Sequence, residues 1–243
     1  RNEIMYHFGL ICFIFALFCL VLTQVTTTQI DNVNVWYKPF KFSLSTMLYT
    51  WAMAWFIHYL PDYDPTWFNW SIIILLGFEI VYIAIQASRG ERSHFNISTP
   101  IYNLLYMLMA FAASAVTIYT AYIGVLFFQN NVASLPEHYL WSIRAGIFIF
   151  VIFAFEGFLM GARMTHTIGG ADGGESLPVV GWSRKFGDPR IAHFIGMHAL
   201  QVLPILSYYL LKNTKLTLMA IILYAFLAVF TLVQALNGKP FLK

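Results

Sequence analysis

Charged residues are scarce in this chain: Asp, Glu, Lys and Arg make up 10% of its 243 residues, and hydrophobic residues make up 59%. A soluble domain usually carries about 25% charged residues. So little charge excludes a sizeable soluble domain, and a net charge of +3 is too small to indicate a nucleic-acid partner. The composition favours a polytopic membrane protein that forms a single domain over residues 1–243.

Cysteine is also rare. Cys12 and Cys19 lie seven residues apart in one apolar stretch, so they share a face of the helix predicted there. Two cysteines in this setting are more typical of small buried side chains than of a disulfide or a metal site. Disulfide and cysteine-metal frameworks are therefore not indicated.

Long apolar runs, in contrast, are abundant. A membrane-spanning helix needs roughly 20 mostly apolar residues, and backbone polar groups in lipid must bond to one another. The predicted spans are residues 6–28, 42–60, 68–88, 101–128, 139–163, 191–211 and 216–237. The aromatic and lysine-containing stretch before the second span is predicted to lie at the membrane interface. The sequence thus predicts an all-α protein with seven transmembrane helices.

Basic residues are divided unevenly between the two ends of these helices. Ten lie at one end and four at the other, and the more basic end of a membrane protein usually faces the cytoplasm. The ten are Lys38, Lys41, Arg89, Arg92, Arg163, Arg184, Lys185, Arg190, Lys239 and Lys243, and the four are Arg1, Arg144, Lys212 and Lys215. This predicts an N-terminus outside and a C-terminus in the cytoplasm.

Four of the seven histidines fall at that same basic end. They are His94 after the third span, His166 after the fifth, and His193 and His198 at the start of the sixth. Neutral imidazole is the commonest metal ligand and also an axial ligand of haem. His193 and His198 point about 140° apart around a helix, so one ion does not suit both. As a group they predict a shared cofactor site, although each alone fits a helix cap or an interfacial anchor.

Two acids lie deeper in the predicted spans, Glu79 in the third and Glu156 in the fifth. Each begins a polar stripe that runs at helical spacing toward the histidines, and Gln201 forms such a stripe with His198. Ionisable groups within spans usually face the bundle interior or a wet cavity, which makes both acids candidate catalytic residues. The alternative is that they are neutral, or paired with an Arg or Gln side chain.

A glycine-rich loop over residues 165–190 joins the fifth and sixth spans. Its segment Gly169–Gly174 has the composition of an anion-binding backbone nest, but the Lys-Ser/Thr of a P-loop is missing. Asp188 followed by proline is typical of the N-terminus of the next helix. We expect the loop to fold back as a lid over the polar stripes, with Trp182 and Phe186 sealing it.

Several motifs of known seven-helix or histidine-rich membrane proteins are missing. The last span lacks the central lysine that binds retinal in microbial rhodopsins, because no lysine lies between Lys215 and Lys239. The His-x-x-x-His of seven-helix zinc hydrolases is missing from that span, and so are the histidine boxes of membrane desaturases. These three chemistries are therefore not indicated.

Three strings carry a resemblance to a family. They are Arg89-Gly with Ser93-His-Phe-Asn, His166-Thr-Ile-Gly-Gly-Ala-Asp-Gly-Gly-Glu-Ser-Leu-Pro-Val-Val-Gly-Trp-Ser, and Gly187-Asp-Pro-Arg-Ile-Ala-His-Phe-Ile-Gly-Met-His-Ala-Leu-Gln. With them, over half of the chain resembles an uncharacterised family of bacterial seven-helix integral membrane proteins. The resemblance implies the bacterial cytoplasmic membrane and assigns no reaction and no functional residue.

The leading hypothesis is a membrane protein that holds a b-type haem or a divalent transition metal at its cytoplasmic end, for redox or metal-assisted chemistry on a quinone or lipid. The predicted ligands are His94, His166, His193 and His198, and the further cofactor-binding residues are Gln201 and Trp182. One alternative is a proton- or cation-coupled transporter or channel that uses Glu79 and Glu156. The other is a structural subunit that packs against partner membrane subunits.

Overall fold

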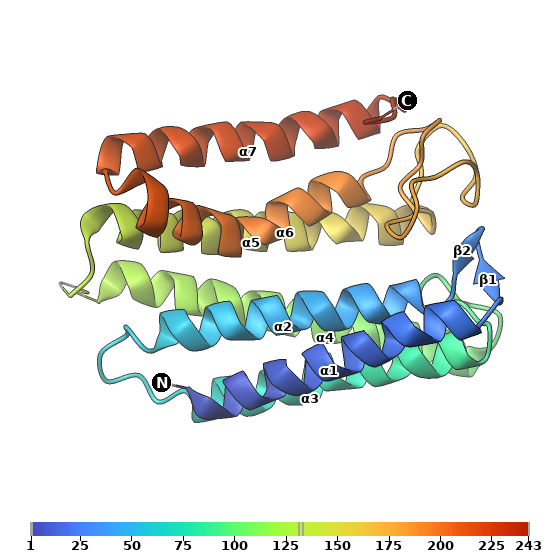
Figure 1. Ribbon diagram of the computed structural model, residues 1–243, viewed down its shortest axis with the longest axis horizontal. Coiled ribbons are helices and arrows are strands. Elements are labelled where there is room, and N and C mark those ends of the chain that lie inside the picture. Colours follow the sequence, from blue (N-terminus) through green and yellow to red (C-terminus); the bar gives the residue numbers. More distant parts are fainter. Residues whose placement is uncertain (1, 131, 133, 243) are drawn as a thin grey trace.

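The computed structural model describes residues 2–130, 132 and 134–242. Within them, seven long α-helices run side by side, which confirms the predicted all-α fold (Figure 1). They are α1 Glu3–Val25, α2 Tyr37–Ile57, α3 Thr66–Ser88, α4 Pro100–Gln129, α5 Glu137–Arg163, α6 Arg190–Leu206 and α7 Thr214–Leu236. A π-helical segment, η1 Ser207–Leu211, continues α6, and two short strands, β1 Gln29–Ile30 and β2 Val33–Asn34, connect α1 to α2.

Six of the described helical segments are long and apolar enough to cross a membrane: α1, α3, α4, α5, α6 with η1, and α7. This make-up is that of an integral membrane protein. The exception is α2, which begins at Tyr37 and therefore takes in the lysine-containing stretch that was predicted to lie outside the helix. It buries the hydroxyl side chains of Ser43, Thr46 and Thr50 against other helices. A helix enclosed by its neighbours in this way does not need the apolar surface that lipid requires.

The two ends of the bundle differ in what they carry. The C-terminus, the β1–β2 hairpin, the α3–α4 connection and the α5–α6 loop (residues 164–189) lie together at one end, and the N-terminus lies at the other (Figure 1). We call the first the histidine end, because His94 and His166 lie in its connections and α6 begins there with His193 close to its start. The opposite end is called the core end.

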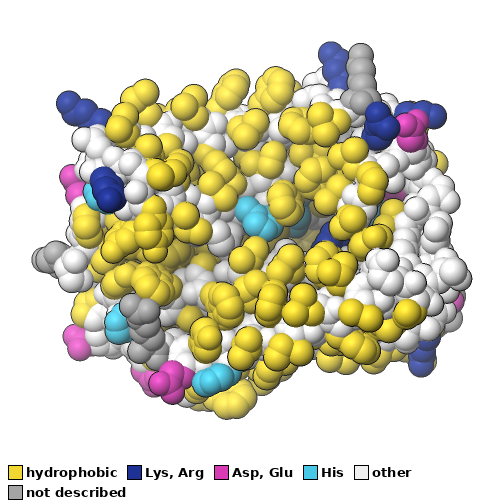
Figure 2. Space-filling view, viewed as in Figure 1, with side chains coloured by type: hydrophobic (Ala, Val, Ile, Leu, Met, Phe, Trp, Pro, Cys, Tyr) yellow, Lys and Arg dark blue, Asp and Glu magenta, His cyan; other side chains and the backbone are white. Residues whose placement is uncertain are grey.

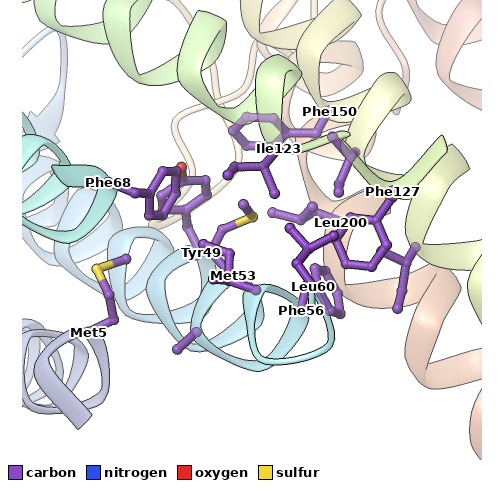
Figure 3. Packing of buried hydrophobic residues seen from close by; sticks show 14 of the residues in the cluster. Met5, Tyr49, Met53, Phe56, Leu60, Phe68, Ile123, Phe127, Phe150 and Leu200 are labelled. Carbon is purple, nitrogen blue, oxygen red and sulfur yellow. The ribbon is translucent and has the colours of Figure 1, made fainter. Parts of the chain in front are cut away.

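The largest apolar core occupies the core end. It is formed by the second halves of α2 and α4 and the first halves of α3 and α5, with Leu200 of α6 (Figure 3). Met53, Phe68 and Phe127 are fully buried there, at 0% exposure. The hydroxyl of Tyr49 bonds to Thr120 Oγ1 at 2.7 Å, so the polar atoms of this core are paired. Close packing of this kind is what sets the geometry of the remaining helices.

Helices α5 and α6 approach each other closely because glycines lie at their contact. A Cβ atom on Gly146 of α5 would lie 2.9 Å from the backbone oxygen of Ala199 in α6. A Cβ on Gly196 of α6 would lie 2.0 Å from the ring of Phe153 in α5. These contacts fix α6, and the histidines on it, against α5.

The β1–β2 hairpin ties the connections of the histidine end together. Asp31 and Asn32 form its turn with φ of 53° and 61°, as a tight two-residue hairpin requires. Asp31 forms an ion pair with Arg92 in the α3–α4 connection. Asn32 Nδ2 donates to the carbonyl of Gly173 in the α5–α6 loop at 2.5 Å. The hairpin therefore holds two other connections in place.

The α5–α6 loop is folded rather than extended, and its bounds agree with the prediction within one residue. Two isolated β-bridges, Ile168 with Gly187 and Ser176 with Ser183, close it on itself. A Cβ atom on Gly187 would lie 1.9 Å from the carbonyl oxygen of Ala235, so the loop backbone lies directly on the end of α7. The loop is thus anchored to α7 on one side and to the hairpin on the other.

Candidate functional site

Three of the four predicted histidines lie near one another at the histidine end. Burial lowers the pKa of His94 well below its ordinary value, and positive charge on Lys38, His166 or His193 lowers it further. Burial also lowers the pKa of His166, although Asp172 opposes that shift. His94 and His166 are therefore neutral at pH 7, which leaves ring nitrogens free to act as ligands.

Lys38 of α2 lies near these histidines, because its positive charge acts on both His94 and His166. Both Lys38 and His94 keep part of their surface accessible. Figure 2 shows that the side face of the bundle is covered mostly by hydrophobic side chains, with imidazoles near its middle.

All four imidazoles have Nδ1 against an oxygen atom. The contacts are His94 with Ser93 Oγ at 3.1 Å, His166 with Asp172 Oδ2 at 3.0 Å, His193 with Glu156 Oε2 at 3.4 Å, and His198 with Phe194 O at 2.8 Å. Across the described residues, none of these rings uses Nε2 in a hydrogen bond. Metal-ligating histidines usually direct one ring nitrogen at a carboxylate or carbonyl and bind with the other. His166, His193 and His198 are arranged in this manner, whereas His94 faces a hydroxyl.

The pair formed by His193 and Glu156 joins α6 to α5. The carboxylate is 6% exposed, and the ring lies over Gly157, where an added Cβ would come within 3.1 Å of it. At 3.4 Å the two groups are within ion-pair distance, but neither makes a hydrogen bond within the described part of the chain. The two groups are therefore close but not hydrogen-bonded, and a small rotation of either side chain would form the hydrogen bond.

His166 is held by the loop around Asp172. The Asp172 carboxylate accepts from the backbone nitrogen and ring of His166 and from the hydroxyls of Thr165 and Thr167. Burial alone would raise the pKa of Asp172, but these hydrogen bonds hold it below its ordinary value. The segment Gly169–Gly174, predicted as a nest for a bound anion, thus surrounds the chain's own carboxylate.

Phe95 adds a strained backbone beside the histidines. Its φ is 59°, a left-handed conformation that is unusual for an aromatic residue. The strain sets its ring centroid 4.8 Å from that of His166. His94 also contacts the rings of Phe42 and Tyr106, with centroids 5.6 and 6.2 Å away. Strain of this kind gathers at functional sites, where surrounding packing enforces it.

The two acids of the predicted stripes are buried at the same end of the bundle, and no arginine pairs with them among the described residues. Glu79 is 7% exposed, and its Oε1 has no hydrogen-bond partner in that part of the chain. Tyr82 OH and Gln201 Oε1 are likewise buried without a partner. Arg144, one of the candidate partners, instead donates to the carbonyl of Phe127 at 2.9 and 2.7 Å.

His198 lies near His193, whose charge acts on it, and Trp182 lies one side chain further away. The ring of Trp182 packs edge-on against Phe194, and Phe194 packs against His198 with centroids 4.1 Å apart. Phe186, the other predicted sealing residue, packs on Gly170 within the loop. Trp182 therefore reaches His198 only through Phe194, and the loop covers the start of α6.

The predicted metal ligands do not converge on one point. Among the residues that the structure describes, no three His, Cys, Asp or Glu side chains are grouped closely enough to hold one metal ion. His94, His166 and His193 lie near one another, and His198 lies near His193 but packs against Phe194. A site for one ion with three protein ligands would need side-chain rearrangement.

Lys38 and Asp172 are functional candidates that the sequence analysis did not single out. Lys38 belongs to a stretch interpreted as an interfacial anchor, and Asp172 to a glycine-rich loop. The local signals were a lysine pair one turn apart and a carboxylate six residues after a histidine. Neither signal points to a site until the fold brings α2 and the loop into contact.

The fold and these side chains define a class: an all-helical bundle with the composition of an integral membrane protein and a cluster of polar side chains at one end. No family model, no curated protein and no solved structure matches this chain.

Proposed function

We propose that this chain is an integral membrane protein that binds a redox cofactor at its histidine end, with imidazole Nε2 atoms as ligands. The observation that carries the proposal is the shared orientation of the four imidazoles, each with Nδ1 against an oxygen and Nε2 free of hydrogen bonds in the described chain. We also propose that this end faces the cytoplasm of a bacterial cell, which the excess of basic residues there supports.

The donor set fits b-type haem better than a bare divalent ion. Haem iron needs one or two imidazoles because its porphyrin supplies the other four nitrogens, so three converging side chains are not required. Lys38 lies beside the imidazoles, and its positive charge opposes a bare cation. A haem carries negative propionate groups that this lysine would favour. When bound, such a group supplies one-electron transfer.

The remaining residues then have supporting roles in the proposal. Glu156 would orient His193 and stabilise positive charge on it, as carboxylates do behind metal-bound histidines. Glu79, buried without a partner for Oε1, would exchange protons with a quinone or lipid substrate. Phe95 and Asp172 would keep His166 in one orientation.

The proposal is tested by an oxidised and a dithionite-reduced ultraviolet–visible spectrum of detergent-purified protein, with elemental analysis of the same sample. The expected result is a Soret band that shifts on reduction, about one iron per chain, and loss of both in His193→Ala. Stoichiometric zinc, copper or iron without a Soret band would replace haem with an ion. Aromatic absorption alone, with no metal, would refute the cofactor proposal.

A second candidate function is a proton- or cation-coupled transporter. It is favoured by the buried carboxyl oxygens of Glu79 and Glu156, which lack hydrogen-bond partners within the described residues. Polar groups of this kind in a spanning helix often carry protons or ions. Reconstituted protein should then conduct protons in liposomes, and Glu79→Gln or Glu156→Gln should abolish the flux. Flux that is unchanged in both variants would rule this candidate out.

A further inference from the structure

A pocket opens at the core end of the bundle, where α5 begins and η1 ends. Its volume is about 430 Å³, which lies within the range of ligand-binding pockets. The described residues that line it are Pro136, His138, Tyr208, Tyr209 and Lys212, and none of these is acidic. The α6–α7 turn beside it lies at the opposite end of the bundle from the α5–α6 loop (Figure 1). The pocket is therefore separate from the site described above.

The backbone around the pocket departs from a regular α-helix. Pro204 lies inside α6, where it cannot donate a backbone hydrogen bond, and the π-helical segment η1 begins three residues later. It ends at Lys212, whose φ of 47° is left-handed and whose backbone nitrogen donates to the carbonyl of Ser207 at 3.0 Å. Both conformations are uncommon and occur preferentially at functional sites. This backbone carries Tyr208, Tyr209 and Lys212 to the pocket.

The ring of His138 is held in one tautomer by Ser207. The Ser207 hydroxyl has one hydrogen, which it donates to the carbonyl oxygen of His138 at 3.0 Å. Its other two contacts, His138 Nδ1 at 3.1 Å and Thr217 Oγ1 at 3.0 Å, must therefore donate to it. With its hydrogen on Nδ1, a neutral His138 keeps a lone pair on Nε2, which makes no hydrogen bond within the described chain. The ring thus offers a hydrogen-bond acceptor to a ligand.

The other polar side chains of the pocket can donate hydrogen bonds. The Lys212 side chain is exposed and forms no ion pair within the described chain. The ring of Tyr208 packs edge-on against Tyr139 and against Tyr209, with centroids 5.1 and 5.0 Å away. The pocket therefore combines one cation and two phenols with one imidazole acceptor.

This combination selects among ligands. A lysine ammonium binds phosphate as a point charge, and lysine and tyrosine are common where lipid headgroups lie. A phosphate diester alone would leave the Nε2 acceptor of His138 unused, because it has no hydrogen to donate. A ligand that carries hydroxyl groups beside its phosphate satisfies both groups. Leu210, between the two pocket tyrosines and Lys212, is 73% exposed and supplies an adjoining apolar surface for an acyl chain.

We propose that this pocket binds the headgroup of an acidic phospholipid with headgroup hydroxyls, a phosphoglycerol. The phosphate lies against Lys212, and a headgroup hydroxyl donates to His138 Nε2. Ser207 acts as a positioning residue, because its contacts hold the hydrogen of the ring on Nδ1. The inference concerns the opposite end of the bundle from the proposed cofactor, so either proposal can fail alone.

The test is native mass spectrometry of the purified chain in detergent with four ligands at equal concentration. These are phosphatidylglycerol, phosphatidylmethanol, phosphatidylcholine and soluble glycerol phosphate. Phosphatidylmethanol has the same charge as phosphatidylglycerol but no headgroup hydroxyl. The variants are Lys212→Met, Lys212→Arg and His138→Phe, with Lys215→Met and His58→Phe as controls that change exposed residues at the same end. Thermal unfolding of each variant shows whether it is folded.

We expect one phosphatidylglycerol per chain, bound about threefold or more tightly than phosphatidylmethanol, the effect of one hydrogen bond. Lys212→Met should weaken the binding of both acidic lipids by about fivefold, as expected for one lysine at a membrane surface. Lys212→Arg should retain it. His138→Phe should remove the preference for phosphatidylglycerol while phosphatidylmethanol still binds. Both control variants should behave as the native chain does.

Three results would overturn the inference. In the first, folded Lys212→Met binds both acidic lipids as tightly as the native chain does. In the second, the native chain binds phosphatidylglycerol no better than phosphatidylmethanol or phosphatidylcholine, so that no headgroup is recognised. In the third, glycerol phosphate binds as tightly as the lipid and with the same dependence on Lys212, which would make the ligand a soluble phosphate ester.

Discussion

The two ends of this bundle are built from the same helices but bury different kinds of side chain. At the core end, large side chains such as Phe68 and Phe127 are fully buried in apolar contacts, and the Tyr49 hydroxyl is hydrogen-bonded. At the histidine end, Glu79 and Glu156 are buried with carboxyl oxygens that lack hydrogen bonds within the described chain. Burial stabilises the first end and is costly at the second.

A cost retained in one region indicates that the region does something other than stabilise the fold. The polar atoms of the histidine end come from α2, α3, α5, α6 and two connections, so no single mutation would have created them together. The glycine contacts of α5 with α6, and the core at the other end, hold that arrangement in place. In the proposed function the core end is the scaffold and the histidine end is the site.

The largest effect is expected in the core. Phe127→Ala removes a fully buried ring and should lower the free energy of unfolding by about 3–5 kcal/mol. Phe111→Ala is the matched control on the same helix, because that ring is 65% exposed. Unfolding in mixed detergent–SDS micelles measures both. Equal losses would show that burial in this bundle does not determine the contribution of a ring.

A smaller loss is expected where the α5–α6 loop meets α7. Gly187→Ala would set a Cβ 1.9 Å from the Ala235 carbonyl oxygen and should cost about 1–3 kcal/mol. Gly174→Ala, in the same loop, meets nothing within 4 Å and should change stability by less than about 0.5 kcal/mol. Thermal unfolding distinguishes them, and identical melting temperatures would mean that the loop is not anchored to α7.

The opposite sign is expected at the site. Glu79→Leu replaces a buried carboxyl that lacks one hydrogen bond and should raise the free energy of unfolding by about 1–3 kcal/mol while activity falls. The same SDS titration measures the gain. A destabilised Glu79→Leu protein would show that the carboxyl is structural, and the contrast between the two ends would fail.

The last contrast is in the pH dependence of stability. His94 and His166 have folded-state pKa values below the ordinary value of about 6.5, so the unfolded chain binds more protons below that pH. Stability is therefore complete above about pH 6.5 and falls as the pH drops below it, by up to about 1.4 kcal/mol per histidine per pH unit. Asp172, whose pKa is lowered, adds a separate loss in more acid solution.

This dependence is measured by SDS unfolding at pH 7.5 and 5.5, for the native chain and for a variant that carries both His94→Asn and His166→Asn. The variant should lose less stability than the native chain between the two values. Parallel curves for the two proteins would show that these imidazoles titrate normally and are not enclosed in the folded state.

The helices could be predicted from the sequence because the apolar runs and their polar separators are local features. The loop between α5 and α6 and the α6 start at Arg190, with Pro189 as N-cap, agree with the predictions within one or two residues. The beginning of α2 could not be predicted from its own residues, because Lys38 and Lys41 are accommodated only by the loop and α6 that pack on them. Tertiary surroundings, not local hydropathy, decide that helix.

The candidate site, like the fold, has some features that the sequence predicts and others that it does not. Placement of His94, His166 and His193 at one end follows from the span count alone. The pairing of His166 with Asp172 and of His193 with Glu156 depends on loop folding and on helix rotation, which a single sequence does not specify. His198 points away from His193 around the helix because it lies five residues further on, yet the two rings stay close enough for the charge of His193 to act on His198.

The most direct test of the central claim is the amount of cofactor bound by single histidine variants from both ends of the bundle. His94→Ala, His166→Ala and His193→Ala each remove a ring from the group at the histidine end, and His58→Ala removes an exposed ring at the core end. Each is purified, and its Soret absorbance and metal content are measured per folded chain. The account predicts loss or a clear spectral change in the first three and none in His58→Ala. Equal cofactor content in all four, or none in the native chain, would contradict it.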